Sequence, residues 1–332
     1  MVLVSRFLLL LTAFLLCSAI AKANDSSAEL AVGGLILTNS DAISLDREDL
    51  YISEKEVRVD YVFTNTSAKD IDTLVAFPFP DQIFKDEDDY FITGLDNAKI
   101  STMVDGKPLK LVHLKKAVLN NVDITEKVRK LNVPIDSNGE DFHAAVTALD
   151  PAVLAKLLQK GVIRKRVWDK APLPFFPGWI FQSYYTRHQF FPAGKSIKVQ
   201  HRYAPLVGGS VGGNLDQEDR VDVEGKERLK RYCPDDGFFK KLDQHIARST
   251  ESEYIANYHE VWLGYVLKSG ANWKGPIKDF RLVVDTGDPN TLVSFCAEGI
   301  KSISPTKYEV RKKNFEPTRD LDILIVKLRT SP

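Results

Sequence analysis

The chain has 332 residues, 44% of them hydrophobic, and its 45 basic side chains balance 45 acidic ones. This composition is typical of a globular protein with a sizeable core, and it excludes disordered, collagen-like, disulfide-dense and multi-span membrane chains. A formal net charge of zero also argues against nucleic-acid binding, which needs a basic excess. We therefore expect a globular protein with no nucleic-acid partner.

The first 23 residues have the pattern of a secretory signal peptide. Arg6 supplies the positive start, residues 7–21 form an apolar run, and Ala21-Lys22-Ala23 matches the small-x-small pattern that precedes cleavage. We predict cleavage before Asn24 and a periplasmic or secreted protein of the Gram-negative envelope. No later segment is apolar enough to cross a bilayer, so we expect no transmembrane segment in the mature chain.

Cleavage would leave two of the three cysteines. Cys17 lies within the signal, and the leucine before it disfavours lipidation, because a lipidated cysteine follows a small residue. An even number of thiols in an oxidising compartment favours a disulfide between Cys233 and Cys296, to which the chain-entropy model assigns roughly 4 kcal/mol. Two separate buried thiols are the alternative, and a metal site is disfavoured because no CxxC or paired histidine spacing accompanies them.

Residues 24–116 are expected to form an N-terminal β domain. Residues 57–63 alternate with the period of a half-buried strand, and residues 71–77 return as a second strand. Pro78 and Pro80 end that strand, because proline cannot donate to a ladder. Asp105-Gly106, between two apolar runs, predicts a hairpin.

Residues 117–164 are expected to be a helical insert. Asp150-Pro151 reads as the N-cap and first position of a helix, with apolar residues at helical spacing and Gly161 at its end. A shorter helix is expected at 125–131.

Residues 165–332 are expected to form a C-terminal β domain with one or two helices. Residues 184–191 and 196–203 predict a hairpin about the Pro192-Ala193-Gly194-Lys195 turn, and residues 208–220 an exposed glycine-rich loop. Residues 227–248 predict helix, interrupted at Pro234, and residues 321–328 a last, largely buried strand. The expected fold is mainly β, with two β-sandwich-like halves and a helical insert.

Five phrases of the sequence carry a family resemblance. They are Val59 to Ser67 (VDYVFTNTS), Val75 to Asp81 (VAFPFPD), Phe191 to Lys195 (FPAGK), Asn272 to Ile277 (NWKGPI) and Leu292 to Cys296 (LVSFC). Together they resemble the bacterial exported family known as domain of unknown function 4424, over nearly the whole mature chain. The first two are also distantly similar to the vault and inter-alpha-trypsin type of β domain. The family resemblance implies an envelope location and supplies no activity, ligand or catalytic residue.

The predicted hairpin gives one candidate site. If Pro192 pairs with Lys195, His188 faces Val199 and lies diagonal to His201 on the same face, near enough for the imidazoles to meet. Such a pair could bind a metal or transfer protons. No acidic residue lies on that face and its other residues are core-like, so we predict a structural role without a metal.

The aromatic stretch at 165–191 gives a second candidate. Phe175, Phe176 and Trp179 could form a platform that stacks a sugar or docks a peptide, or they could fill the core. Prolines prevent a regular ladder here, so the stretch must run as a loop or an edge. We expect most of these rings to be buried, with Trp179 the one most exposed.

Two further motifs are weak. Gly208-Gly209-Ser210-Val211-Gly212 fits the nucleophile-elbow pattern, but no strand-to-helix context surrounds it, so we reject an esterase. Asp86-Glu87-Asp88-Asp89 could bind calcium, but it lacks the spacing of an EF-hand loop and is better explained as a solvated acidic loop.

These observations favour a non-enzymatic envelope protein that binds a protein or glycan partner and needs no cofactor. The alternative is a periplasmic hydrolase with its site near His188 and His201. A concave pocket with titratable groups in mutual reach would favour the enzyme, and an apolar or aromatic patch without them would favour the binding module.

Overall fold

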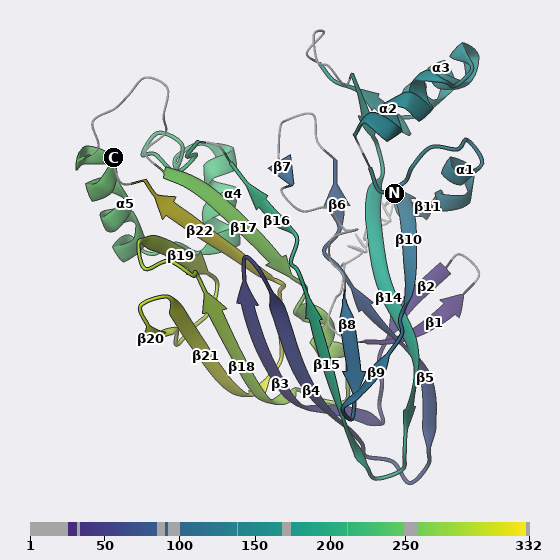
Figure 1. Cartoon of the computed structure of the whole chain (residues 1–332), viewed down its shortest axis with the longest axis vertical. Helices are drawn as coiled ribbons and strands as arrows, with labels where there is room; N and C mark the ends of the chain where they lie inside the picture. The colour runs from purple at the N-terminus through teal and green to yellow at the C-terminus, as the bar shows by residue number, and fades with distance from the viewer. Residues whose placement is uncertain are drawn as a thin grey trace, which may run out of the picture.

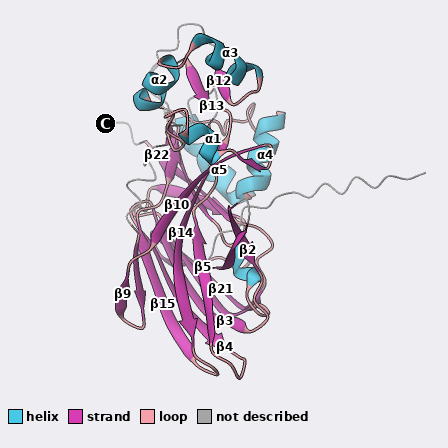
Figure 2. Cartoon of the chain, turned by 90° about the vertical axis from the view of Figure 1, so that its right-hand side faces the viewer, coloured by secondary structure: helices cyan, strands magenta, loops and turns pink. Residues whose placement is uncertain are grey.

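The computed structural model describes residues 26–31, 34–84, 90–91, 100–137, 139–167, 174–210, 212–248 and 258–329. The predicted signal peptide and the acidic run at 86–89 lie outside the described residues. The fold is mainly β, as predicted: four sheets carry a few helices (Figures 1 and 2). Among the described residues, no helix has the length and apolar character needed to cross a bilayer.

The largest sheet has eight strands and joins the two ends of the chain. In spatial order they are β20 (Lys301–Ser304), β21 (Lys307–Phe315), β18 (Ile277–Asp285), β3 (Ile43–Ser53), β4 (Val57–Asn65), β15 (Ser196–Tyr203), β8 (Ser101–Val104) and β9 (Lys107–Leu109). The central β3 and β18 pair in parallel, with Leu50 opposite Leu282, while the other pairs are antiparallel. The β8–β9 hairpin confirms the prediction from Asp105-Gly106. Strands expected in the N-terminal and C-terminal domains thus share one sheet, and the division at 116 and 164 stays a prediction.

A seven-stranded sheet faces it across the core. Its main order is β11 (Val122–Asp123), β10 (Val112–Leu119), β14 (Ile180–Phe191), β5 (Ile71–Pro78), β1 (Ser26–Ala31) and β2 (Gly34–Thr38), and β6 (Gln82–Ile83) also pairs with β14. Figure 1 shows this sheet on the right and the eight-stranded sheet on the left.

The predicted hairpin of residues 184–203 is wrong, although its turn is present. Lys195 N donates to Pro192 O and Gly194 has φ 63°, yet β14 pairs with β5 and β10 while β15 pairs with β4 and β8. Buried Asn65, at the end of β4, lies at this corner. Its backbone N–H donates to Lys195 O at 3.0 Å and its side chain donates to Phe191 O at 2.9 Å, so the two strands separate into different sheets.

The third sheet has five strands: β19 (Thr291–Phe295), β22 (Leu321–Leu328), β17 (Tyr258–Tyr265), β16 (Val207–Gly209) and β7 (Tyr90–Phe91). The prediction of a buried last strand is confirmed. The predicted glycine loop is wrong at its start, because Gly208 and Gly209 lie buried in β16. A Cβ on Gly208 would lie 1.9 Å from Trp262 Nε1, so only glycine allows this close approach.

Two helices pack on the outer face of this sheet. They are α4 (Val223–Tyr232) and α5 (Asp236–Arg248), which confirms the predicted helix with a break at Pro234. Even-numbered residues of β22 contact them, while Ile323 and Ile325 face the main core. Successive side chains of a strand point to opposite faces of its sheet, so this alternation shows that β22 is covered on both faces.

The predicted helical insert contains α1 (Thr125–Arg129), α2 (Glu140–Thr147) and α3 (Pro151–Gln159), followed by a small sheet of β12 (Ile163–Lys165) and β13 (Phe175–Pro177). Asp150 caps α3, since its carboxylate accepts hydrogen bonds from the N–H groups of Ala152 and Val153. Figures 1 and 2 place α2 and α3 at one end of the molecule, beyond β14. A short 3₁₀ helix, Lys268–Asn272, follows β17.

Candidate functional site

The two predicted histidines lie in different sheets and do not form a site together. His188 is exposed on the outer face of β14, with Nδ1 3.7 Å from Asp72. His201 is fully buried on β15, where its Nδ1 lies 2.7 Å from Thr102 Oγ1 and its ring contacts Tyr61 and Phe77. The prediction that they share a face is therefore wrong, and a hydrolase site built on this pair loses its geometric basis.

The aromatic segment covers the core. Phe176 and Trp179 are buried and Phe175 is half-buried. Trp179 Nε1 donates to Ile135 O at 2.9 Å, and its ring packs edge-on against Phe142 of α2. The expectation that most of these rings are buried is confirmed. The expectation that Trp179 is the most exposed of them is wrong, because the helical insert closes over it.

A serine–histidine contact that the sequence did not suggest lies between β10 and β14. His113 Nε2 is 2.7 Å from Ser183 Oγ, within the range of a nucleophile and its base. The two residues approach because residues on adjacent strands share one face. Ser183 is 1% exposed, so a substrate cannot reach its hydroxyl. We assign this contact a structural role.

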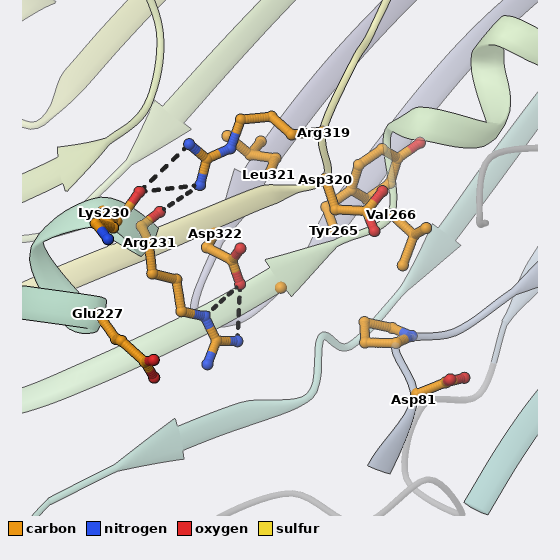
Figure 3. A pocket seen from close by; sticks show the side chains of 12 residues that line it. Asp81, Glu227, Lys230, Arg231, Tyr265, Val266, Arg319, Asp320, Leu321 and Asp322 are labelled. Atoms are coloured by element: carbon orange, nitrogen blue, oxygen red, sulfur yellow. Dashed lines mark hydrogen bonds and ion pairs between the residues drawn. The ribbon is translucent and has the colours of Figure 1, made fainter. Parts of the chain in front are cut away.

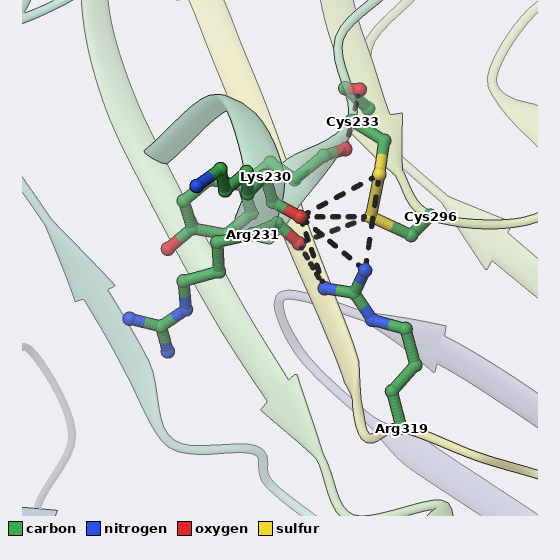
Figure 4. The surroundings of a disulfide bond; sticks show 7 residues. Lys230, Arg231, Cys233, Cys296 and Arg319 are labelled. Atoms are coloured by element: carbon green, nitrogen blue, oxygen red, sulfur yellow. Dashed lines mark hydrogen bonds between the residues drawn. A yellow bond between two sulfur atoms is a disulfide. The ribbon is translucent and has the colours of Figure 1, made fainter. Parts of the chain in front are cut away.

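The predicted disulfide is confirmed. Cys233 and Cys296 form a bond with a Cα–Cα distance of 5.0 Å (Figure 4). Cys233 ends α4 in the left-handed conformation, with φ 53°, and Cys296 directly follows β19. The bond therefore ties the end of a helix to the edge strand of the five-stranded sheet.

An apolar slot of about 420 Å³ opens beside this disulfide. Its walls are Leu267, Phe280, Leu282, Val310, Phe315 and Leu321. Leu282 of β18 lies directly opposite Val310 of β21, and Phe280 is the next residue on that face. These side chains share a face because alternate residues of a strand do. A concave apolar site of several hundred Å³ is the usual form of a small-molecule pocket.

Arg319 stands at the mouth of the apolar slot. Figure 4 shows its guanidinium beside the disulfide and directed at the end of α4. Its Nη2 donates to Arg231 O at 2.9 Å, and both Nη atoms lie 3.3 Å from Lys230 O. A cation is favoured at these carbonyls, because the C-terminus of a helix carries partial negative charge. The contact holds the guanidinium in one place.

A charged cavity of about 620 Å³ lies on the other side of the segment Arg319–Leu321. It is formed where α4, β17 and the start of β22 meet the chain that follows β5 (Figure 3). Arg231 Nη2 lies 2.8 Å from Asp322 Oδ1 across it. The remaining charged residues that line the cavity are Asp81, Glu227, Lys230, Arg319 and Asp320.

Burial shifts two carboxyl groups of this cavity. It raises the pKa of Asp81 above the usual aspartate value, although Gln182 Nε2 donates to the carboxylate at 3.0 Å. It also raises the pKa of Asp320, whose Oδ1 accepts from Lys268 N at 3.0 Å. Carboxyl groups with raised pKa values in a cavity are typical of functional sites.

Sequence reasoning missed both cavities, although one signal was present. The apolar residues Phe280 and Leu282 stand at alternate positions of one strand, and Val310 is an apolar residue of the neighbouring strand. Nothing in the sequence predicts that Leu267 and Leu321 line the same slot. That closure depends on packing between the eight-stranded and five-stranded sheets. Within the described part of the chain, no three His, Cys, Asp or Glu side chains are grouped so as to hold a metal.

A family model described as "Domain of unknown function (DUF4424)" matches residues 23–324. No curated protein matches the chain. Among solved structures, a crystal structure from Legionella pneumophila, described as a "putative nutrient binding protein", is similar over 92% of this chain and 73% of that one, with 16% sequence identity and a TM-score of 0.45.

Proposed function

The chain belongs to the DUF4424 family, and we propose that it is an exported, non-enzymatic binding module of the bacterial envelope whose ligand places an apolar group in the apolar slot. The observation that carries this proposal is the slot itself. Phe280, Leu282 and Val310, each 2% exposed, form its floor, while half-buried Ala297 and Phe315 leave apolar surface open to a volume of about 420 Å³. A ligand that fills this volume adds contacts which the free protein lacks.

The slot favours a ligand with an apolar group over a glycan. Sugar rings stack on aromatic faces that are open to solvent, and Phe176 and Trp179 are buried. A peptide or small molecule with an aliphatic or aromatic group fits the walls better, because those walls are leucine, valine and phenylalanine.

Binding of the neutral apolar dye N-phenyl-1-naphthylamine tests the proposal. We expect saturable binding at one site, seen as an increase in dye fluorescence. Val310→Phe should abolish it by filling the slot, and Val112→Phe, on an exposed strand position outside the slot, should not change it. The proposal fails if the dye does not bind, or if both variants bind it equally well.

Export is tested on the natural protein. Mass spectrometry of the protein purified from a periplasmic extract should give a chain that begins at Asn24 and has lost two hydrogens to the disulfide. A chain that keeps its first 23 residues, or is recovered only from the cytoplasm, would contradict the proposed location.

A further inference from the structure

We propose that the ligand of the apolar slot is an amphiphile with one apolar chain and an anionic head group, which Arg319 and Lys312 hold at the mouth. This inference rests on the proposed function and names the chemistry of the ligand. It follows from how the charges that line the slot are held: Arg319 has no carboxylate partner among the described residues, and Lys312 has only the solvent-exposed Glu298.

Arg319 is a fixed cation whose charge no carboxylate neutralises among the described residues. All of its polar contacts are to the carbonyl oxygens of Lys230 and Arg231 and to Cys233 Sγ at 4.0 Å. Carbonyl oxygens orient a guanidinium and leave its formal charge in place. A guanidinium has five N–H donors, so this one can still donate to a ligand. A guanidinium also binds carboxylates and phosphates with good geometry.

Lys312 supplies a second cation in line with the apolar wall. It lies opposite Phe280 in the β18–β21 register, on the same face as Val310, and lines the slot. Its Nζ is 3.6 Å from Glu298 Oε2, but the Glu298 side chain is 96% exposed. An ion pair of this kind is weak, because water screens it, so a ligand anion can replace Glu298.

The remaining carboxylate that lines the slot, Asp320, already has a hydrogen-bond partner in the protein. Asp320 accepts a hydrogen bond from the backbone N–H of Lys268, and burial disfavours its charged form. An Asp320 side chain held in this way does not disfavour an anion beside Arg319. An anionic head is therefore favoured over a cationic one, which would face Arg319 and Lys312 directly.

Three ligands with the same ten-carbon chain separate the possibilities. Decanoate, decanamide and decylamine carry a negative, a neutral and a positive head, and each can be titrated against the bound dye below its aggregation concentration. We expect decanoate to bind about tenfold more tightly than decanamide, a difference of about 1.4 kcal/mol, and decylamine most weakly. Raising the salt concentration should weaken decanoate alone.

Substitutions identify the head-group site. Arg319→Gln and Lys312→Gln should each reduce decanoate binding several-fold and leave decanamide binding unchanged. Arg319→Lys should restore part of the affinity. Lys313→Gln is the matched control, because Lys313 is the next residue on β21, 74% exposed and paired with Asp279 outside the slot. The circular dichroism spectrum of Arg319→Gln checks that α4 remains folded.

The two proposals fail in different ways. If decanamide binds as tightly as decanoate, or if Arg319→Gln weakens both equally, the anionic head group is wrong and the apolar slot remains a binding site. If the dye binds but decanoate does not displace it, this inference alone is wrong. If the dye does not bind, the proposed function is wrong and this inference falls with it.

Discussion

Two apolar regions of the molecule differ in how completely they are filled. Under α2, the ring of Phe142 packs edge-on against Trp179, Phe176 is buried in the same core, and the indole N–H donates to Ile135 O. Beside the disulfide, Phe280, Leu282 and Val310 border open volume. The first region has the higher density of aromatic residues in sequence, and it is the closed one. Aromatic content therefore indicates packing, while access depends on which elements close over it.

The largest expected effect is on the closed region. Trp179→Ala removes a fully buried ring and leaves Ile135 O without its donor, so we expect the free energy of unfolding to fall by about 3–5 kcal/mol. Urea denaturation measures this. Dye binding at the apolar slot should persist below the unfolding transition, because the two regions are separate. A fall of less than about 1 kcal/mol in the free energy of unfolding would show that Trp179 is not packed under α2 as described.

The disulfide beside the open region should matter almost as much. Replacing Cys233 and Cys296 together by serine is expected to lower the free energy of unfolding by about 2–4 kcal/mol, because the bridge spans 63 residues and restricts the unfolded chain. Thermal unfolding of the double variant against the wild type checks this value. We also expect weaker dye binding, since the bridge forms one wall of the slot. An unchanged affinity would remove the disulfide from the binding site.

A pair of enlarging substitutions compares the two regions directly. Val146→Phe, in the closed core of α2, should cost about 1–3 kcal/mol because the core has no room for the ring. Val310→Phe should cost less than about 1 kcal/mol, because the added ring can enter the apolar slot. An equal fall in the free energy of unfolding for both variants, measured by urea denaturation, would mean that the apolar slot is packed as tightly as the core under α2.

The smallest expected effect is a pH dependence at the mouth of the slot. Burial raises the pKa of Asp320 above 3.8, so the folded state holds this proton more tightly than the unfolded state does. Its contribution to stability is therefore complete below the unfolded pKa and falls as the pH rises through the folded pKa. Asp320→Asn should remove this decline, measured by urea denaturation as the pH is raised from below 3.8.

Asp243 provides the control with the opposite sign. A hydrogen bond from Arg220 lowers the pKa of Asp243, so its contribution is present above the unfolded pKa and is lost as the pH falls. Asp243→Asn should therefore reduce stability at neutral pH and leave it unchanged at low pH. The same pH profile for both asparagine variants would contradict the assignment of Asp320.

Sequence predicted the features that depend on neighbouring residues. The cap at Asp150, the Asp105-Gly106 hairpin and the break between α4 and α5 follow from local backbone and side-chain preferences. The Pro192–Lys195 turn was also predicted correctly, but the pairing of its flanking strands was not. A turn is a local property, whereas Asn65 comes from another strand and separates β14 from β15.

The candidate site was less predictable for the same reason. The disulfide followed from cysteine number and compartment, but the apolar slot needs β18, β21, the residue before the 3₁₀ helix and the start of β22 together. Arg319 had no sequence signal, because its position depends on the carbonyls that end α4. The prediction that His188 and His201 share a face is wrong because it assumed that β14 pairs with β15, whereas β14 pairs with β5 and β15 with β4.

The parallel pairing of β3 with β18 has a consequence for how the chain folds. Arg281 Nη1 bonds Asp49 Oδ1 in this pair across 232 residues of sequence. Contacts between such distant residues make folding slow, because a long loop must close before the contact forms. The first strands of the eight-stranded sheet therefore keep an unpaired edge until β18 has been synthesised. An unpaired strand edge is prone to aggregation, so the free edge of β3 is exposed to wrong pairing until β18 is added.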